Sequence, residues 1–229
     1  MLARRPLAAA ATAVTAALVA LSALSGCAAA NVGAADAATA AATAAAGKRA
    51  GAERVAVVGD SIESGLGLEP SEAWPALVAD ARAWRLDNLS VPGAGFIAQG
   101  SDGHDFSGQV DTAIASKAQL VLIGASDNDL GEDLGQVEDA MSAAVDRLST
   151  DLPDARIVGF NALSGAASDD ELAPLDAALQ KAVESAGGTW IDLGQPYRGQ
   201  AGLVQDDGEH PTLPGQQAIA TVVESKLAA

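Results

Sequence analysis

The sequence predicts an α/β fold in which helices cover both faces of a parallel sheet. Short apolar runs such as Val55–Val58 and Gln119–Gly124 lack the alternation of a half-exposed strand. Such runs are typical of strands that are buried on both faces. Segments with apolar residues at helical spacing separate them. Strands that alternate with helices in this way form a parallel sheet with right-handed connections.

The expected elements follow one another from Val55 to the end of the chain. Strands are expected at 55–58, 84–91, 119–124, 156–160 and 189–193, and helices at 71–82, 107–116, 135–152, 169–186 and 212–228. Pro153 and Gly187-Gly188 end two of the helices. The last helix is expected to bury Ala218, Val222 and Leu227. We find no internal repeat and no second folded domain.

Ser61 follows the first apolar run in the order Gly59-Asp60-Ser61. It should therefore lie at the carboxyl end of a parallel strand, where open α/β folds bind ligands. A serine there can act as a nucleophile if a histidine and a carboxylate reach it. The alternative is that Ser61 only caps the next turn. The G-x-S-x-G elbow of α/β-hydrolases does not fit, because Glu63 occupies the position of its second glycine.

His210 is the one histidine that has a carboxylate at a useful spacing. Asp207 precedes it by three residues and can accept a hydrogen bond from one ring nitrogen, which leaves the other nitrogen to take a serine proton. The alternative is a structural Asp–His pair that caps the last helix. His104 lies in a Gly-rich polar loop, and we expect it to be exposed and not catalytic.

Four stretches, in this order, resemble sequence blocks I, II, III and V of the SGNH (GDSL) hydrolases. They are Gly59–Ile62, Asn88–Gly93, Ile123–Asp129 and Gln205–Pro211. The last is similar to the thioesterase–lysophospholipase branch in particular. The resemblance covers roughly residues 54–227. It implies a three-layer α/β/α, flavodoxin-like fold with a five-stranded parallel sheet, and the hydrolysis of esters.

The same resemblance implies roles for single residues. Ser61 is the nucleophile, His210 the base and Asp207 the acid that orients it, while Asp206 is only a neighbour. The resemblance also implies an oxyanion hole, formed by the backbone N–H groups of Ser61 and Gly93 and by the side chain of Asn128.

Ser126 is a departure from the family pattern, because block III has glycine at this position. A side chain there could narrow the site or add a polar contact. The departure bears on the size of the substrate more than on the chemistry, because Asn128 and Asp129 are retained.

The N-terminus resembles the signal peptide of bacterial lipoproteins. Arg4 and Arg5 precede an apolar run that ends in Leu24-Ser25-Gly26-Cys27. The resemblance implies cleavage before Cys27 and lipidation of that residue. The alternatives are an ordinary signal peptide and an uncleaved anchor helix. We therefore expect a signal peptide over 1–26, the lipidated cysteine and an Ala-rich flexible tether over 27–53, and the hydrolase domain over 54–229.

The charge and cysteine content exclude several classes of function. The formal net charge is −17, and without Arg4 and Arg5 the chain keeps 11 basic against 30 acidic residues. A surface this acidic repels nucleic acid and anionic lipid headgroups, so membrane association would depend on Cys27. A single cysteine excludes an intramolecular disulfide. No cluster has metal-ligand spacing, so we expect neither a metal nor a cofactor.

The sequence thus predicts a monomeric serine esterase, anchored by lipidated Cys27 to the outer face of the bacterial cell membrane. Its substrates would be small-molecule or lipid acyl esters. Two alternatives keep the chemistry, namely a carbohydrate O-deacetylase and an acyltransferase of the cell envelope. A third is an envelope lipoprotein that keeps the fold and only binds ligands.

Overall fold

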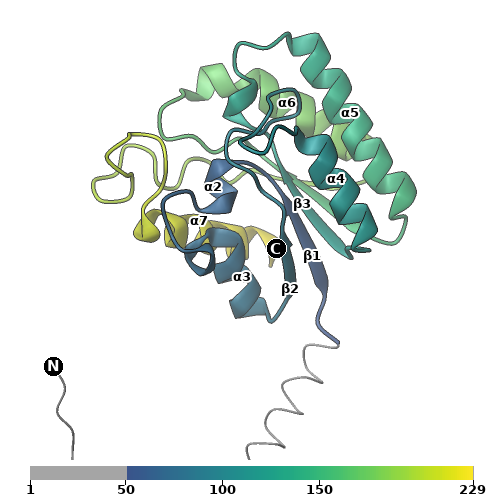
Figure 1. Ribbon diagram of the computed structural model, residues 1–229, viewed down its shortest axis with the longest axis horizontal. Helices are drawn as coiled ribbons and strands as arrows, with labels where there is room; N and C mark the ends of the chain where they lie inside the picture. Colours follow the sequence, from purple (N-terminus) through teal and green to yellow (C-terminus); the bar gives the residue numbers. More distant parts are fainter. Residues whose placement is uncertain (1–50, 229) are drawn as a thin grey trace, which may run out of the picture. The chain divides into compact units, whose positions relative to one another are not determined.

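The protein is described by a computed structural model that covers residues 51–228. Cys27, the expected signal peptide and most of the expected tether lie outside the described residues. A five-stranded, fully parallel sheet runs through the domain in the order β2-β1-β3-β4-β5 (Figure 1). The strands are β1 (Arg54–Val58), β2 (Arg85–Asn88), β3 (Leu120–Gly124), β4 (Arg156–Phe160) and β5 (Thr189–Ile191). The predicted fold class is confirmed.

Helices connect the strands and cover both faces of the sheet. The α-helices are α2 (Ser61–Ser64), α3 (Trp74–Arg82), α4 (Phe106–Ala115), α5 (Leu134–Asp151), α6 (Asp169–Ser185) and α7 (Leu213–Leu227), and the two short 3₁₀ helices are η1 (Pro70–Glu72) and η2 (Asp127–Asp129). Within the described part of the chain, no helix is long and apolar enough to cross a membrane.

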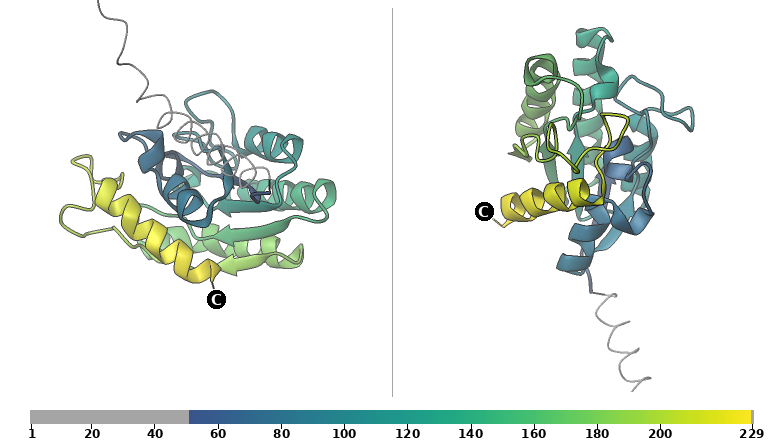
Figure 2. Two further views of the ribbon diagram at one scale, coloured as in Figure 1. Left: turned by 90° about the horizontal axis from the view of Figure 1, so that it is seen from below. Right: turned by 90° about the vertical axis from the view of Figure 1, so that its left-hand side faces the viewer.

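Alternate residues of the central strands belong to two separate cores. Val55 and Val57 pack with α2, α3 and α7, whereas Ala56 and Val58 pack with α4, α5 and α6. Figure 2 shows these two helical layers from two further sides, with α7 in yellow. This arrangement explains the unbroken apolar runs, because a strand covered on both faces has no polar side to alternate with.

Several predicted boundaries are wrong in detail. The helix expected to start at Ser71 is divided into η1 and α3, because Pro75 fits only the first turn of an α-helix. The strand expected at 84–91 pairs only over Arg85–Asn88, and the strand expected at 189–193 ends at Ile191. Both are edge strands with a partner on one side only, so less of their length is held in the ladder.

The buried face of α7 also differs from the prediction. Its buried residues include Gln216, Ile219, Ala220 and Val223. The buried face is therefore shifted by about one residue from the predicted one, which did not include Gln216. That side chain is fully buried because its amide is used twice: Oε1 accepts from the backbone N–H of Trp74 at 2.7 Å, and Nε2 donates to the carbonyl of Ile62 at 2.9 Å.

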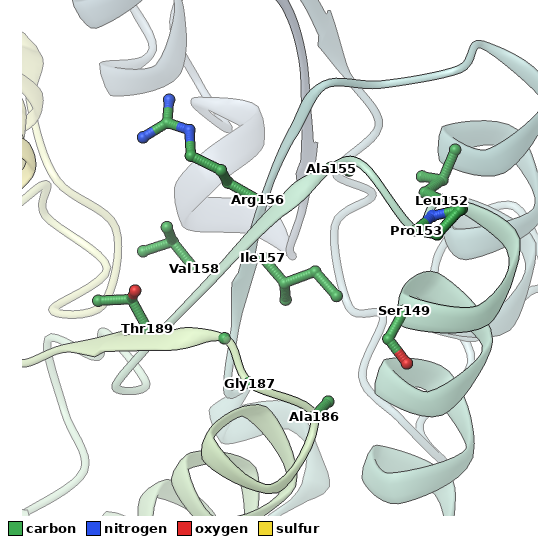
Figure 3. A pocket seen from close by; sticks show the side chains of 11 residues that line it. Ser149, Leu152, Pro153, Ala155, Arg156, Ile157, Val158, Ala186, Gly187 and Thr189 are labelled. Atoms are coloured by element: carbon green, nitrogen blue, oxygen red, sulfur yellow. The ribbon is translucent and has the colours of Figure 1, made fainter.

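The loops at the two ends of the sheet differ in kind. The loops after β1, β3 and β4 carry polar residues, including Ser61 and Asn128. At the opposite end, the starts of β4 and β5 border a pocket of about 300 Å³ that is lined mostly by aliphatic side chains and glycine, with Arg156 at its edge (Figure 3).

Candidate active site

Ser61 is the first residue of α2, a single helical turn at the carboxyl end of β1. Asp60 caps this turn, because its Oδ1 accepts from the backbone N–H of Ile62 at 2.9 Å. Glu63 completes a capping box by accepting from the N–H of Asp60 at 3.1 Å. Asp60 and not Ser61 is thus the cap of this turn, and Ser61, at 9 % exposure, is largely buried.

Gly59 is required by the close approach of the Glu63 side chain. A Cβ at this position would lie 2.6 Å from Cγ of Glu63. The amide of Gln109 reaches across from α4 and both accepts from the N–H and donates to the carbonyl of Gly59, each at 2.9 Å. The sequence reading missed the buried roles of Glu63 and Gln109. The position of Glu63, three residues after an Asp cap, was the available signal for the first of them.

His210 and Asp207 reach Ser61 from the loop before α7. Nε2 of His210 lies 2.9 Å from Oγ of Ser61, and Nδ1 of His210 lies 2.8 Å from Oδ2 of Asp207. Hydrogen bonds from His210 and from the N–H groups of Glu209 and His210 lower the pKa of Asp207 to about 2. An ionised Asp207 accepts a hydrogen bond from the protonated Nδ1 of His210. The other ring nitrogen, Nε2, is then free to accept a hydrogen bond from the Ser61 hydroxyl. The three predicted residues are therefore joined in one hydrogen-bonded chain.

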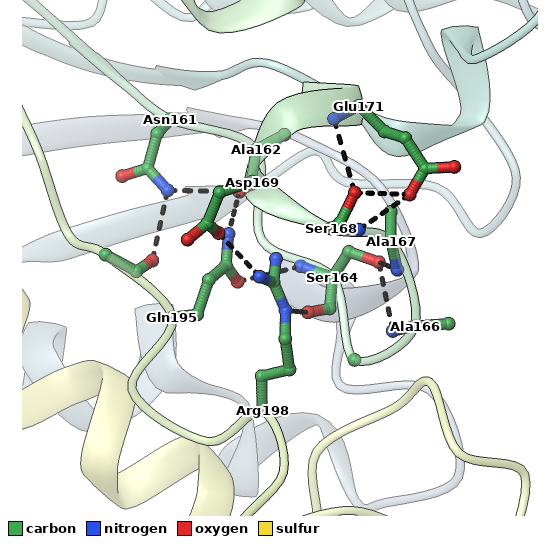
Figure 4. Close-up of polar contacts among 12 residues, drawn as sticks. Asn161, Ala162, Ser164, Ala166, Ala167, Ser168, Asp169, Glu171, Gln195 and Arg198 are labelled. Carbon is green, nitrogen blue, oxygen red and sulfur yellow. Dashed lines mark hydrogen bonds and ion pairs between the residues drawn. The ribbon is translucent and has the colours of Figure 1, made fainter. Parts of the chain in front are cut away.

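The loop that carries His210 is fixed to the neighbouring loop after β4. The carboxylate of Glu209 accepts from the N–H groups of Gly165 and Ala166 at 2.9 and 3.0 Å, and from the Ser164 hydroxyl at 3.2 Å. Ser164 in turn accepts from Arg198 through its backbone carbonyl (Figure 4). A Cβ at Gly165 would lie 2.4 Å from the carbonyl oxygen of Glu209, so the two loops touch. The sequence offered no signal for this role of Glu209.

Gln205 ties the same loop to the segment after Ser61. Its Nε2 donates to the carbonyls of Leu66 and Pro211, each at 2.9 Å. The backbone N–H of Gln205 donates to the carbonyl of His210 at 2.8 Å, which closes the loop on itself. The histidine is therefore held from both sides, by Glu209 and by Gln205.

Gly93 lies in the loop after β2 and has a φ of 81°. A Cβ there would meet only Cα of Gly100, at 3.8 Å. Glycine is therefore favoured here because the backbone is left-handed, and not because a side chain would clash with the described residues.

Asn128 lies in η2, after β3, and its side chain faces the loop of Gly93. Nδ2 donates to the carbonyl of Ala94 at 3.1 Å and to Oγ of Ser126 at 3.0 Å. The carbonyl of Ala94 can only accept, so it requires the nitrogen and determines the orientation of the amide. The structure thus brings the side chain of Asn128 next to Ala94, the residue that follows Gly93.

Asp129 fixes the loop of Gly93 against η2. Its carboxylate is 1 % exposed and accepts from the backbone N–H groups of Phe96, Ile97 and Ala98 at 2.7, 2.9 and 3.0 Å. A Cβ at Gly95 would lie 2.5 Å from Oδ1 of Asp129. The sequence reading noted Asp129 without this function, which is to hold the two segments that carry Gly93 and Asn128 together.

Buried carboxyl groups surround the site. Burial raises the pKa of Asp60 and of Glu63, and for Asp60 the neighbouring Glu63 adds to the effect. Burial also raises the pKa of Asp127 to about 7, with the charges of Asp60 and Glu209 contributing and the Ser164 hydroxyl opposing. The low dielectric around these groups disfavours their charged forms.

His104 is separate from this site. Its side chain is 72 % exposed and lies 3.7 Å from Asp102, in agreement with the expectation of an exposed histidine. Among residues 51–228, no group of three or more His, Cys, Asp or Glu side chains has an arrangement that could hold a metal ion.

Comparisons with known proteins identify the family and support the fold. Residues 57–218 match the profile of a family described as GDSL-like Lipase/Acylhydrolase. Comparison with curated protein sequences finds no match. Among solved structures, that of TesA superimposes with a TM-score of 0.65 at 22 % identity, over 76 % of this chain and 98 % of that one.

Two further solved structures have the same fold. The psychrotrophic esterase EstA from Pseudoalteromonas sp., inhibited by monoethylphosphonate, gives a TM-score of 0.63 at 17 % identity, over 77 % of this chain and 97 % of that one. A family two carbohydrate esterase from Clostridium thermocellum, in complex with cellohexaose, gives a TM-score of 0.65 at 15 % identity, over 76 % of this chain and 63 % of that one.

Proposed function

Since the chain belongs to the GDSL-like lipase/acylhydrolase family and is an ester-hydrolysing enzyme, we propose that it acts as a serine esterase through Ser61, His210 and Asp207. The observation that carries the proposal is the hydrogen-bonded chain from Ser61 through His210 to Asp207, with distances of 2.9 and 2.8 Å. It supports the proposal because proton removal from serine needs an unprotonated nitrogen at this distance.

The proposed reaction has two steps. Ser61 Oγ attacks the ester carbonyl while His210 Nε2 takes the serine proton, and His210 then gives that proton to the leaving alcohol. Water attacks the resulting acyl-enzyme, with His210 again as the base. Asp207 stabilises the charged imidazole in both steps, and its low pKa keeps it ionised.

The oxyanion of each tetrahedral intermediate needs hydrogen-bond donors. The proposed donors are the backbone N–H groups of Ser61 and Gly93 and the side chain of Asn128. The contact of Asn128 with the carbonyl of Ala94 supports this assignment, because it places the amide beside the segment of Gly93.

Exposed leucines favour acyl chains as part of the substrate. The exposed large apolar side chains of the described residues are Leu66, Leu130 and Leu134, at 43, 39 and 40 % exposure. Leu66 follows α2, and Leu130 and Leu134 follow η2, so each lies within six residues of Ser61 or Asn128. Exposed apolar side chains on the segments that carry Ser61 and Asn128 are available to contact the hydrocarbon part of a substrate.

The proposed location of the enzyme depends on Cys27. Lipidation of this residue would anchor the domain at the outer face of the bacterial cell membrane, and the domain would work there as a monomer. Incorporation of labelled fatty acid into the full chain, lost in Cys27→Ser, is the expected result. An unlabelled parent chain would contradict the anchor and leave the esterase proposal intact.

The esterase proposal is tested with the full chain in a mild non-ionic detergent. Release of a chromogenic alcohol is followed for esters of increasing acyl length and for an acetylated sugar, with Ser61→Ala beside the parent. We expect turnover of acyl esters by the parent and a loss of about 10⁴-fold or more in the variant. A phosphonate probe should label the parent and not Ser61→Ala.

Other outcomes distinguish the alternatives. Turnover of the acetylated sugar alone would replace the acyl-ester proposal by a carbohydrate O-deacetylase, and a carbohydrate esterase is among the solved structures with this fold. Acyl transfer to an added alcohol, in preference to water, would indicate an acyltransferase. Neither turnover nor labelling of Ser61 would indicate an envelope protein that only binds.

A further inference from the structure

Ser126 occupies a position that bears directly on the oxyanion donor. It is the N-cap of η2, directly after β3, and is fully buried. A side chain with no exposed surface does not line the substrate site, so it does not narrow that site. Of the two effects that the sequence suggested for this departure from glycine, the structure favours the polar contact.

Four polar atoms surround the Ser126 hydroxyl. They are Oδ2 of Asp60 at 2.6 Å, Nδ2 of Asn128 at 3.0 Å, the carbonyl oxygen of Ala94 at 3.1 Å and the backbone N of Asn128 at 3.2 Å. A hydroxyl has one proton and two lone pairs. The two nitrogens of Asn128 can only donate, so they use both lone pairs. The proton is left for Asp60, the nearer of the two acceptors.

This hydroxyl therefore joins two parts of the proposed active site. On one side it holds Asp60, the residue before the nucleophile and the cap of α2. On the other side it accepts from the amide nitrogen of Asn128, which the carbonyl of Ala94 orients toward the segment of Gly93, and so gives that nitrogen a second fixed contact. Glycine at this position would supply neither contact.

The contact with Asn128 is also one that an oxyanion can replace. Hydrogen bonds to a charged acceptor are about twice as strong as those between neutral groups. An N–H of Asn128 therefore binds an oxyanion more strongly than it binds the neutral hydroxyl of Ser126. Donors that are oriented before the charge develops stabilise it best, so the rate depends on the position in which Ser126 holds the amide.

We propose that Ser126 is a positioning residue, which orients the Asn128 amide and fixes it relative to the nucleophile turn through Asp60. This inference rests on the proposed role of Asn128 as an oxyanion donor. Ser126 does not touch the substrate, so its removal changes the chemical step rather than substrate binding.

The test is a double-mutant cycle on the full chain with Ser126→Ala, Asn128→Ala and the combination. Ser126→Ala should lower kcat by about 3- to 10-fold, the effect of one or two hydrogen bonds, with KM within about twofold. Asn128→Ala should lower kcat by about 10²- to 10³-fold. In the Asn128→Ala background, Ser126→Ala should have no further effect on kcat, because the residue through which it acts is absent.

Several results would overturn the inference. An equal loss in both backgrounds would mean that Ser126 acts without Asn128, and a rise in kcat for Ser126→Ala would mean that it competes with the oxyanion. Normal activity of Asn128→Ala would overturn the oxyanion assignment itself, and the inference with it. If Ser126→Ala and Asn128→Ala each lowered kcat and their effects simply added, this inference would fail but the esterase proposal would stand.

Two further variants separate positioning from stability. Ser168→Ala removes the cap of α6, which belongs to a capping box far from Asn128 in the chain. It should lower the unfolding temperature with kcat unchanged. Ser126→Cys fills nearly the same volume with a weaker donor and acceptor, and it should give a kcat between those of the parent and Ser126→Ala. Parent-like activity of Ser126→Cys in a folded protein would contradict the inference.

Discussion

The two ends of the parallel sheet differ in their content of basic residues. Ser61, Asn128 and His210 gather at the carboxyl end, among exposed carboxylates such as Asp206 and Asp207. Of the nine basic residues within 51–228, eight lie toward the amino end, at strand starts, in the turn before β3 or in the C-terminal parts of helices. The ninth, Arg198, is paired with Asp169 at 2.5 Å.

The polarity of the fold explains this separation. In a sheet whose strands are all parallel, the connecting helices run back along it, so their N-termini lie at the carboxyl end. Helix N-termini favour Asp, Ser and Thr as caps and acidic residues in the first turn, whereas C-termini favour bases. The caps Asp60, Asp105, Asp133, Ser168 and Thr212 follow this rule, as do Arg82 and Lys226 in last turns. The acidity around the site therefore has a structural origin.

The largest expected difference between the two ends is in activity. His210→Asn removes the base that takes the Ser61 proton, and it should lower kcat/KM by about 10⁴-fold or more. Arg156→Gln, at the amino end, breaks an ion pair with Glu53 and should leave kcat/KM unchanged. Initial rates on one chromogenic ester measure both. A loss of more than a few-fold in Arg156→Gln would show that the two ends are not independent.

A smaller effect is expected from the carboxylate that fixes the His210 loop. Glu209→Ala removes the acceptor for Gly165, Ala166 and Ser164, so His210 should lose its fixed position. Misplacement of a base lowers kcat by roughly 10- to 100-fold. The control is Glu171→Ala, which removes a carboxylate that caps α6 only. Equal kcat in the two variants would show that the Glu209 contacts are not needed for catalysis.

A third effect tests the charge separation itself. An anionic ester should react with a kcat/KM about 3- to 10-fold below that of a neutral ester with the same leaving group, after correction for their alkaline hydrolysis. The difference should shrink at high salt, because screening weakens the repulsion. Asp206→Lys should reduce it, whereas Glu184→Lys, near the amino end of the sheet, should not. Equal, salt-independent rates for both esters would remove any functional consequence of the acidic end.

The smallest expected effect concerns stability. The pKa of Asp127 is raised to about 7 from a usual 3.8, because the carboxyl is buried and near Asp60 and Glu209. The folded state therefore holds this proton more tightly than the unfolded chain does, and stability falls as the pH rises from about 4 to about 7. Asp127→Asn should raise the unfolding temperature by about 2–5 °C at pH 8 and by less at pH 5. An equal gain at both pH values would contradict this origin.

Much of the carboxyl end could be predicted from the sequence. Ser61, Asp207 and His210 were identified because short patterns place them at fixed offsets from a strand end or from each other. The residues that hold them could not be predicted in this way. Glu209 contacts a loop 44 residues away, and Gln216 reaches Ile62 across 154 residues. Such contacts depend on which loops the sheet order brings together, and no local pattern encodes that.

The α/β class, the approximate positions of the strands and the residue types of the site can be predicted from the chain alone, because burial on two faces and chain offsets are local properties. The folded structure is needed to see how Ser126 connects Asp60 to Asn128, why Gly59 and Gly95 lack side chains, and which face of α7 is buried. The reason is physical. A buried hydroxyl or amide is placed by the donors and acceptors around it, and those come from segments that meet only when the chain is folded.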